Sequence, residues 1–262
     1  MSKRLTAYGW IPDLPDHRDK FYGVLPPEAT QPDITPIFSL RPSMPRVYNQ
    51  LSLNSCVWNA LAALHQRDQM LEAPGKDWTP SRLYGWFWTR FLEGTAPQNA
   101  GCAIRDAIKV LASRGICPES EWQYLEPMFA VPPPVSCDPD ALANVSLAYE
   151  RVPQSEGAIK QCLASGFPII FGATLYDSFE SDAVAKTGMV PMPAAGEDPV
   201  GGHAQVMIGW NDTLDTQRFE VRNSWDETWG DDGHDWMPFD YVLNDNLASD
   251  LWKVTRVQDE AE

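Results

Sequence analysis

The spacing of apolar residues changes about halfway along the chain. In residues 55–72, valine, alanine and leucine recur at intervals of three and four, which predicts an amphipathic helix. Residues 80–94 and 104–113 predict two more helices, the first opened by a proline and the second ended at Gly115. The first half of the chain is therefore predicted to be helical.

The second half has short apolar runs rich in β-branched and aromatic side chains, which are typical of strands. One short helix is predicted at 156–166, where a glycine ends the pattern. The predicted strands are 168–176, 203–210, 218–225 and 251–257. The expected fold class is α+β, with a helical lobe followed by a strand-rich lobe.

Two proline-rich segments set the expected boundaries. Residues 1–46 contain eight prolines and little apolar periodicity, which predicts an extended arm. Residues 127–139 contain five prolines and cannot be a helix interior. We therefore expect an N-terminal arm at 1–46, a helical lobe at 47–139 and a β-rich lobe at 140–262.

Composition and charge narrow the class of protein. With 44% hydrophobic and 21% charged residues, the 262-residue chain is typical of a globular protein rather than a disordered tail or a coiled coil. The net charge is −16, and residues 177–262 hold 5 bases against 19 acids. Such a polyanion repels nucleic acid and anionic membranes.

No apolar run approaches the roughly 18–20 residues of a membrane helix, and the N-terminal residues do not form a secretory signal. We expect a soluble protein that is cytoplasmic by default, with leaderless export as the alternative.

The five cysteines give no sign of a metal site or of a disulfide framework. Five is an odd number, no C-x-x-C pair occurs, and no histidine stands at a metal-ligand interval from a cysteine. No metal is therefore expected, and the default interpretation of most of these cysteines is a small buried side chain.

Cys56 is the cysteine placed for nucleophilic chemistry. It falls in the first turn of the helix predicted at 55–72, where unpaired backbone N–H groups and partial positive charge stabilise a thiolate. Such a nucleophile needs a base. His65 lies nine residues further along the same helix, too far to reach the sulfur, whereas His203 begins a predicted strand. A buried cysteine and a strand histidine also occur in ordinary cores, so this interpretation needs further support.

The glycines before His203, and Asn223 at the end of the next predicted strand, give that support. Gly201 and Gly202 precede His203 and permit a close backbone approach. Asn223 ends the next predicted strand, and antiparallel pairing would bring it beside His203. A neutral amide can orient the imidazole through its second ring nitrogen. Cys56, His203 and Asn223 are therefore the candidate catalytic residues, in a cleft between the two lobes.

Three segments resemble the papain family of cysteine peptidases, and they occur in the family's order. Residues 49–60 (NQLSLNSCVWNA) resemble its N-Q-x-x-x-x-S-C-W segment, and residues 201–210 (GGHAQVMIGW) resemble G-x-H-A-V-x-x-V-G-Y. Residues 221–234 (VRNSWDETWGDDGH) resemble V-x-N-S-W-G-x-x-W-G-x-x-G-Y, and 113–124 gives a weaker match. Together these segments span most of the chain.

The resemblance implies a two-lobe papain-like fold, with an antiparallel β-barrel-like second lobe, and a thiol endopeptidase that forms a thioester acyl-enzyme. In this interpretation Cys56 is the nucleophile, His203 its ion-pair partner, and Asn223 orients the imidazole. Gln50 and the backbone N–H of Cys56 would form the oxyanion hole. The resemblance also implies that Trp225 and Trp229 shield the histidine–asparagine hydrogen bond. It implies further that Gly101 and Gly202 contact the substrate. No cofactor is implied, and the expected partner is a peptide or protein substrate, with basic peptides favoured by the acidic second lobe.

The chain departs from the family at several positions. Asn54 stands where the family usually has glycine, and Val57 follows the cysteine where tryptophan is usual. The proline-rich arm replaces the long helical propeptide of secreted members. Either part of this arm contacts the cleft and restrains access, or it is a structural wrap. Two alternatives to an endopeptidase also stay open: a catalytically weak binding or regulatory protein, and an amidase or transamidase that uses the same site.

Overall fold

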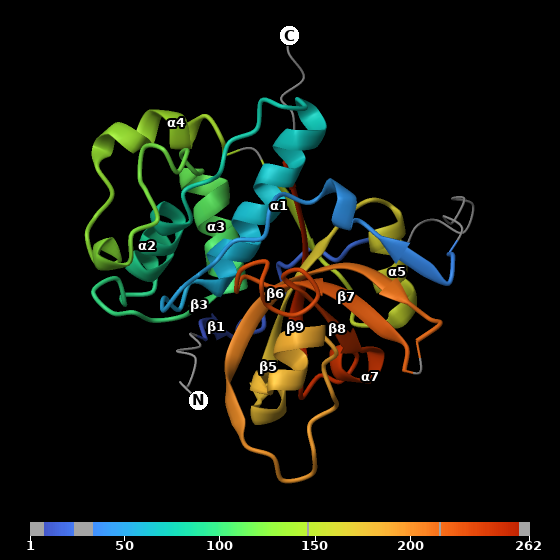
Figure 1. Cartoon of the computed structure of the whole chain (residues 1–262). Coiled ribbons are helices and arrows are strands. Elements are labelled where there is room, and N and C mark those ends of the chain that lie inside the picture. Colours follow the sequence, from blue (N-terminus) through green and yellow to red (C-terminus); the bar gives the residue numbers. More distant parts are fainter. Residues whose placement is uncertain (1–7, 24–33, 146, 215, 257–262) are drawn as a thin grey trace.

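The computed structural model describes residues 8–23, 34–145, 147–214 and 216–256. Its helices are α1 (Cys56–Glu72), α2 (Arg82–Leu92), α3 (Ile104–Arg114), α4 (Asp138–Leu142), α5 (Glu156–Ala164), α6 (Asp182–Thr187) and α7 (Phe239–Val242). Its strands are β1 (Trp10–Ile11), β2 (Ile37–Ser39), β3 (Cys102–Ala103), β4 (Leu147–Arg151), β5 (Ile169–Tyr176), β6 (Pro199–Asn211), β7 (Arg218–Arg222), β8 (His234–Pro238) and β9 (Ala248–Arg256). Figure 1 shows α1 to α4 on one side of the molecule and most of the strands on the other.

Helix α1 lies at the junction of the two lobes. The predicted helix at 55–72 is confirmed, but more of its surface is buried than an amphipathic helix would bury. Its first three turns are almost wholly buried, since α2 and α3 pack on one side and β6 and β9 on the other. Ser55, expected as an N-cap, makes no cap bond from its side chain. Instead its hydroxyl lies 2.6 Å from the Tyr124 hydroxyl, because the helix start is buried beneath that ring.

The second lobe is built on an antiparallel sheet in the order β4-β9-β5-β6-β7-β8, with β2 added beside β6. The four predicted strands are all present, and β6 extends beyond its predicted limits in both directions. The expected barrel-like lobe is an open sheet, because the outermost strands β4 and β8 do not pair with each other among the described residues. Helices α5 and α7 pack on this sheet.

The proline-rich arm contributes strands to two different sheets. β1 pairs in parallel with β3 of the helical lobe, with Trp10 opposite Cys102. β2 pairs with β6 of the large sheet, and Phe38 stacks on Trp210 with ring centroids 4.8 Å apart. The arm is therefore joined to both lobes. Neither short strand was predicted, because each one pairs with a distant segment and shows no alternation of its own.

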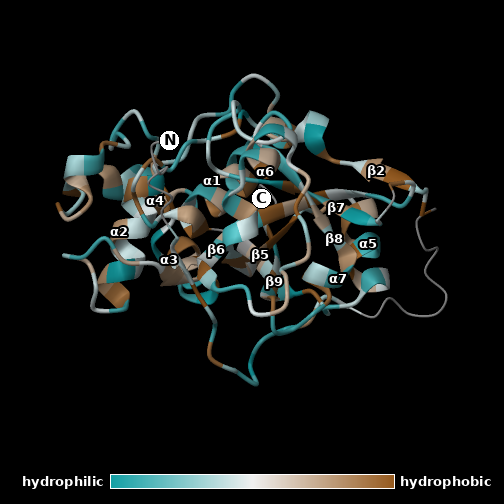
Figure 2. Ribbon diagram, turned by 60° about the horizontal axis from the view of Figure 1, so that its bottom comes forward, coloured by the Kyte–Doolittle hydropathy of each residue, from teal (hydrophilic) through white to brown (hydrophobic). Residues whose placement is uncertain are grey.

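Two large hydrophobic cores hold the lobes together. One core surrounds α1 and includes Trp58 and Trp86, and the other lies under the sheet and includes Trp210 and Trp229. In Figure 2, brown hydrophobic stretches occur on the helices and strands, and the peripheral loops are mainly teal.

None of the described helices has both the length and the apolar character to cross a bilayer. The segment 127–139 holds the short 3₁₀ turns η2 (Glu126–Met128) and η3 (Val135–Cys137), and at its end the first turn of α4, where a proline is tolerated.

Candidate active site

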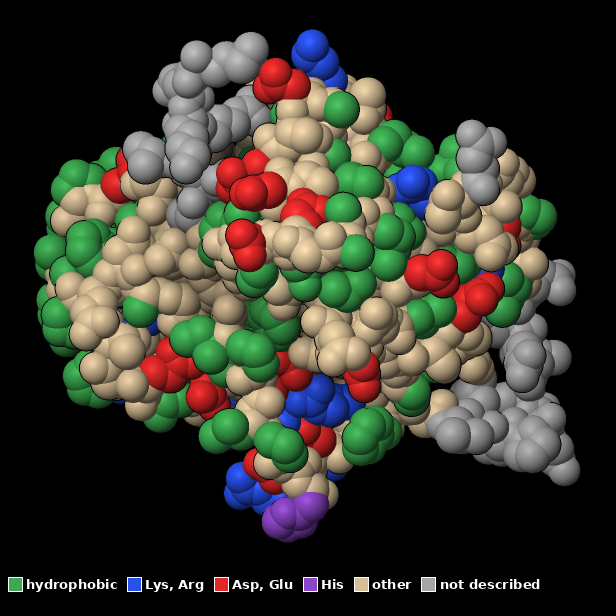
Figure 3. Space-filling model, turned by 90° about the horizontal axis from the view of Figure 1, so that it is seen from below, with side chains coloured by type: hydrophobic (Ala, Val, Ile, Leu, Met, Phe, Trp, Pro, Cys, Tyr) green, Lys and Arg blue, Asp and Glu red, His purple; other side chains and the backbone are tan. Residues whose placement is uncertain are grey.

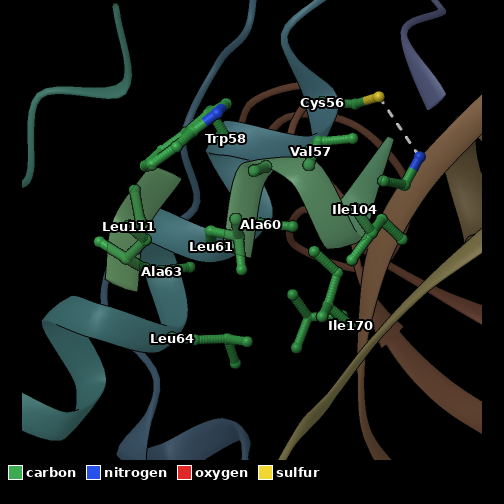
Figure 4. Packing of buried hydrophobic residues seen from close by; sticks show 14 of the residues in the cluster. Cys56, Val57, Trp58, Ala60, Leu61, Ala63, Leu64, Ile104, Leu111 and Ile170 are labelled. Atoms are coloured by element: carbon green, nitrogen blue, oxygen red, sulfur yellow. Dashed lines mark hydrogen bonds between the residues drawn. The ribbon is translucent and has the colours of Figure 1, made fainter. Parts of the chain in front are cut away.

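Cys56 begins α1 and is completely buried. Its sulfur accepts the backbone N–H of Ala204 in β6 at 3.3 Å, the contact drawn in Figure 4. Burial raises the pKa of the thiol to about 11, although hydrogen bonds from backbone N–H groups, first those of Ala204 and Gly9, act in the opposite direction. In this closed arrangement the thiol therefore stays protonated at neutral pH.

His203 and Asn223 come together as the strand pattern predicts. They lie on the adjacent antiparallel strands β6 and just after β7, and His203 Nε2 is 2.8 Å from Asn223 Oδ1. Burial lowers the pKa of His203 to about 4, against the opposing effect of the Asn223 hydrogen bond. Because Asn223 occupies Nε2, the other ring nitrogen, Nδ1, is left for a proton exchange with a nucleophile. That nitrogen is buried and makes no hydrogen bond within the described residues.

Two tryptophans cover the histidine–asparagine pair. The Trp225 ring lies 5.0 Å from the His203 ring, measured between centroids, at an angle of 31°. Trp229 packs edge-on against Trp225 at 5.1 Å, and it is almost fully buried. This packing keeps water from the His203–Asn223 hydrogen bond and so strengthens it.

Gln50 is buried and is fixed by the segment that carries Asn223. The Ser224 hydroxyl donates to Gln50 Oε1 at 2.6 Å, and Gln50 Nε2 donates to the Leu53 carbonyl at 3.0 Å. The backbone N–H of Ser224 in turn donates to Asn223 Oδ1 at 2.7 Å. Ser224 thus links the two predicted site residues, a role that the sequence analysis missed although this serine belongs to the N-S-W segment.

The arm passes directly over this site. The Tyr8 ring meets the His203 ring edge-on, with centroids 6.1 Å apart, and the Gly9 carbonyl accepts the Cys102 N–H at 2.8 Å. Trp10 is 8% exposed and packs in the core around α1. Tyr8, Gly9 and Trp10 therefore form a continuous cover over the site, which we call the arm plug.

The glycines predicted to contact substrate lie against this plug. A Cβ atom on Gly101 would lie 2.4 Å from the Gly9 carbonyl oxygen, and one on Gly202 would lie 2.5 Å from the Trp10 carbonyl oxygen. Real Cβ atoms do not approach other atoms so closely, so both positions need glycine while the plug is in place. Their contact with substrate stays a prediction.

The acidic side chains of the second lobe are partly neutralised by bases from the arm and from the same lobe. Asp212 pairs with Lys160 at 2.8 Å, and Asp231 pairs with Arg41 at 3.0 Å. On the face shown in Figure 3, acidic side chains form several small groups separated by neutral and apolar ones. The field at the site is therefore weaker than the net charge suggests.

Comparisons with known proteins converge on one family. The family model "Papain family cysteine protease" matches residues 95–246, which contain His203 and Asn223. An uncharacterised peptidase C1-like protein of Acanthamoeba polyphaga mimivirus is 34% identical, and the match covers 96% of this chain and 88% of that protein. Gln50 and Cys56 precede the residues matched by the family model, so their assignment rests on the motif and on the contacts given above.

Solved structures give the same result. Xylellain, a cysteine protease from Xylella fastidiosa, is 33% identical, with a TM-score of 0.86 and coverage of 98% of this chain and 99% of that chain. Procathepsin B of Trypanosoma congolense shares the fold at 14% identity, with a TM-score of 0.71 and coverage of 97% and 88%. Together with the family match, these likenesses show that the chain belongs to the papain family of cysteine proteases.

Proposed function

We propose that this chain is a thiol-dependent endopeptidase in which Cys56 attacks the carbonyl carbon of a peptide bond and forms a thioester. One observation carries the proposal. The sulfur of Cys56 accepts the N–H of Ala204, the residue that follows His203. This contact supports the proposal, because it brings the sulfur of the helical lobe to the strand that carries His203.

His203 moves the proton in both halves of the reaction. It takes the thiol proton from Cys56 through Nδ1, because Nε2 is held by Asn223, and then gives that proton to the leaving amine. A water molecule, deprotonated by the same nitrogen, hydrolyses the thioester and returns the thiol. In this proposal Gln50 is the oxyanion donor, and the Ser224 hydroxyl fixes its amide by donating to Oε1.

We propose further that the arm plug keeps the enzyme latent. Cys56, His203 and Gln50 are all completely buried, so a peptide cannot reach them while Tyr8–Trp10 stay in place. The plug also keeps the pair neutral, since burial sets the pKa of Cys56 at about 11 and that of His203 at about 4. Removal of the plug would rehydrate both groups and so favour the thiolate–imidazolium pair.

A buried ionic cluster anchors the arm just beyond the plug. Asp19 accepts from Arg105 and, at 2.6 Å, from Arg151, which also reaches Asp13 at 3.0 Å and Asp250 at 3.2 Å. Asp250 in turn accepts the indole N–H of Trp10 at 3.2 Å. Because one unpaired charge in such a cluster is strongly unfavourable, this anchor holds the arm against both lobes.

Thiol labelling tests the catalytic assignment. The chain without residues 2–12, which lacks the plug but keeps Asp13 and Asp19, is treated with iodoacetamide and the labelled cysteine is mapped by mass spectrometry. We expect fast, stoichiometric labelling at Cys56, slowed about 100-fold or more in His203→Ala and about 30-fold in Asn223→Ala. Slow labelling shared among the five cysteines would instead favour a catalytically weak binding protein.

A turnover assay tests latency and reaction type together. Peptide hydrolysis by the chain without residues 2–12 is compared with that of the full chain, and both are also assayed as Cys56→Ser variants. We expect kcat/KM to rise at least about tenfold on removal of the plug, in line with a plug favoured by a few kcal/mol. Equal turnover in two folded proteins would refute latency. Without peptide cleavage, hydrolysis of other amides would establish an amidase, and transfer of the acyl group to an added amine would establish a transamidase.

A further inference from the structure

A cluster of sulfur and carboxylate ligands lies in the helical lobe, away from the residues of the active site. Its members come from two segments, Cys117 and Glu121 from the loop after α3, and Cys137 from the end of η3. One ligand atom from each of these three residues lies within 4.8 Å of the other two. The carboxylate of Asp140, in the first turn of α4, interacts with that of Glu121 by charge and hydrogen bond.

Each segment carries one cysteine and one acid at short spacing. Cys117 and Glu121 are four residues apart, and Cys137 and Asp140 are three apart. Both sulfurs are completely buried, whereas both carboxylates are exposed. An ion could thus enter from the carboxylate side and reach the sulfurs behind it. This burial excludes water from the thiolate side of a bound ion.

We propose that Cys117, Glu121 and Cys137 bind a divalent metal ion, with Zn²⁺ as the expected ion and Asp140 as the fourth ligand. Two thiolates with oxygen ligands suit Zn²⁺ rather than the harder Mg²⁺ or Ca²⁺. In a tetrahedral site with Zn–S bonds of about 2.3 Å, the two sulfurs lie about 3.8 Å apart. The separations among Cys117, Glu121 and Cys137, each within 4.8 Å, need only side-chain adjustment to reach that geometry. Asp140 is outside this group of three and would reach the ion from its place beside Glu121.

Metal binding at these residues would release protons. Zn²⁺ binds cysteine as the thiolate, so coordination by Cys117 and Cys137 would displace both thiol protons. Any proton held between the carboxyl groups of Glu121 and Asp140 would be displaced as well. Two to three protons would therefore be released for each ion bound.

A disulfide between Cys117 and Cys137 is the competing use of the same sulfurs. Its formation would remove two protons and two electrons and so needs an oxidant that this chain does not supply. It would also leave Glu121 and Asp140 outside the bond that it forms. The metal uses all four side chains.

The ion would fasten the outer part of the helical lobe. Cys117, Cys137, Tyr84 and Ala141 form a small hydrophobic core of their own. The Cys117 carbonyl accepts the N–H of Ser81 at 2.8 Å, at the start of α2. A metal bridge would therefore tie η3 and α4 to α2. This cross-link lies in the lobe that supplies the nucleophile, so its loss should destabilise that lobe without altering the site chemistry.

Metal titration of the full chain tests the proposal. The Cys56→Ser variant, used to remove the active-site thiol, is reduced, stripped with EDTA and titrated with Zn²⁺ and with Cd²⁺. We expect one ion per chain, release of two to three protons, and thiolate-to-cadmium absorption. The measured affinity should fall about 10- to 100-fold in Glu121→Gln and in Asp140→Asn, whose exposed side chains leave the core intact. Asp240→Asn, an exposed acid of α7, is the matched control and should bind as before.

Three results would overturn the proposal. The first is the absence of stoichiometric binding after dialysis. The second is equal affinity in Glu121→Gln, Asp140→Asn and the Asp240→Asn control. The third is a freshly isolated chain, kept free of oxidant, whose mass is two hydrogens low and whose tryptic map joins Cys117 to Cys137, which would establish the disulfide.

Discussion

The indole of Trp10 occupies the space above Gly172, where a Cβ atom would lie 1.9 Å from the ring. Gly172 is in the middle of β5, a strand that otherwise carries buried apolar side chains. A glycine in a strand interior often marks the close approach of another part of the chain. The space that the arm plug occupies is therefore part of the sheet, in a segment that is far from the arm in sequence.

Gly172→Ala should expel the plug without touching the catalytic residues. Overpacking of this kind costs about 1–3 kcal/mol, so kcat/KM of the full chain should rise about 5- to 150-fold. The same substitution should give no rise in the chain without residues 2–12, because there is no plug to displace. Gly157→Ala, in α5 where a Cβ meets nothing within 4 Å, is the matched control. An equal effect of Gly172→Ala on both chains would contradict a seated plug.

The pH dependence of Cys56 alkylation should report whether the plug is closed. In the full chain the thiol pKa is about 11, so the rate should rise about tenfold per pH unit up to that value. Without residues 2–12, restored hydration and the imidazolium should move this rise to much lower pH. Mass spectrometry of the Cys56 peptide gives the rates at each pH. Superimposable profiles for the two chains would show that the plug does not govern the thiol.

His65 should weaken the protein in acid. Burial, then the charge of Arg256, lowers its pKa from 6.5 to about 3, so the folded chain keeps it neutral while the unfolded chain binds a proton below pH 6.5. The unfolding free energy therefore loses up to about 1.4 kcal/mol per pH unit from this group between pH 6.5 and 3. Relative to His65→Leu, the native protein should lose about 2 kcal/mol between pH 7 and pH 5.

Urea unfolding in a Cys56→Ser background, to prevent self-digestion, measures that difference. His65 packs beside Trp78, with ring centroids 5.6 Å apart, so the leucine stays in an apolar setting. Acids whose pKa is raised in the folded chain, such as Asp68 with a pKa of about 6, stabilise the folded state as pH falls. This contribution is the same in both proteins and cancels when they are compared. Parallel stability curves for the two proteins would show that His65 is protonated in the folded state.

Ionic strength should show whether the acidic lobe attracts basic substrates. For the chain without residues 2–12, kcat/KM on lysine- and arginine-containing peptides should fall about 2- to 5-fold as salt rises from low to high concentration. The effect should be modest, because Asp212 and Asp231 are already paired with Lys160 and Arg41. A neutral peptide serves as the control. Salt-independent cleavage of the basic peptides would show that the acids do not act at the site.

Local pattern was enough for the residues that define the site. The start of a predicted helix carried Cys56, and two adjacent antiparallel strands brought His203 within hydrogen-bond reach of Asn223. The ligand cluster was missed because the search required histidine or a C-x-x-C pair, whereas its ligands alternate cysteine with acid. A cysteine followed by an acid three or four positions later was the available signal, but it also occurs at Cys102 and Asp106 and so does not single out this cluster.

Hydrophobic periodicity and the types of nucleophile, base and amide are local properties, so the sequence alone predicted the main helices and strands and the chemistry that each could support. It left open whether the arm reaches the site. The folded chain answers this question, since the plug depends on Gly101, Gly172 and Gly202, which lie on three separate segments and act together only after the chain has folded. The same holds for the charges, because the acids of the second lobe meet their bases through long-range contacts.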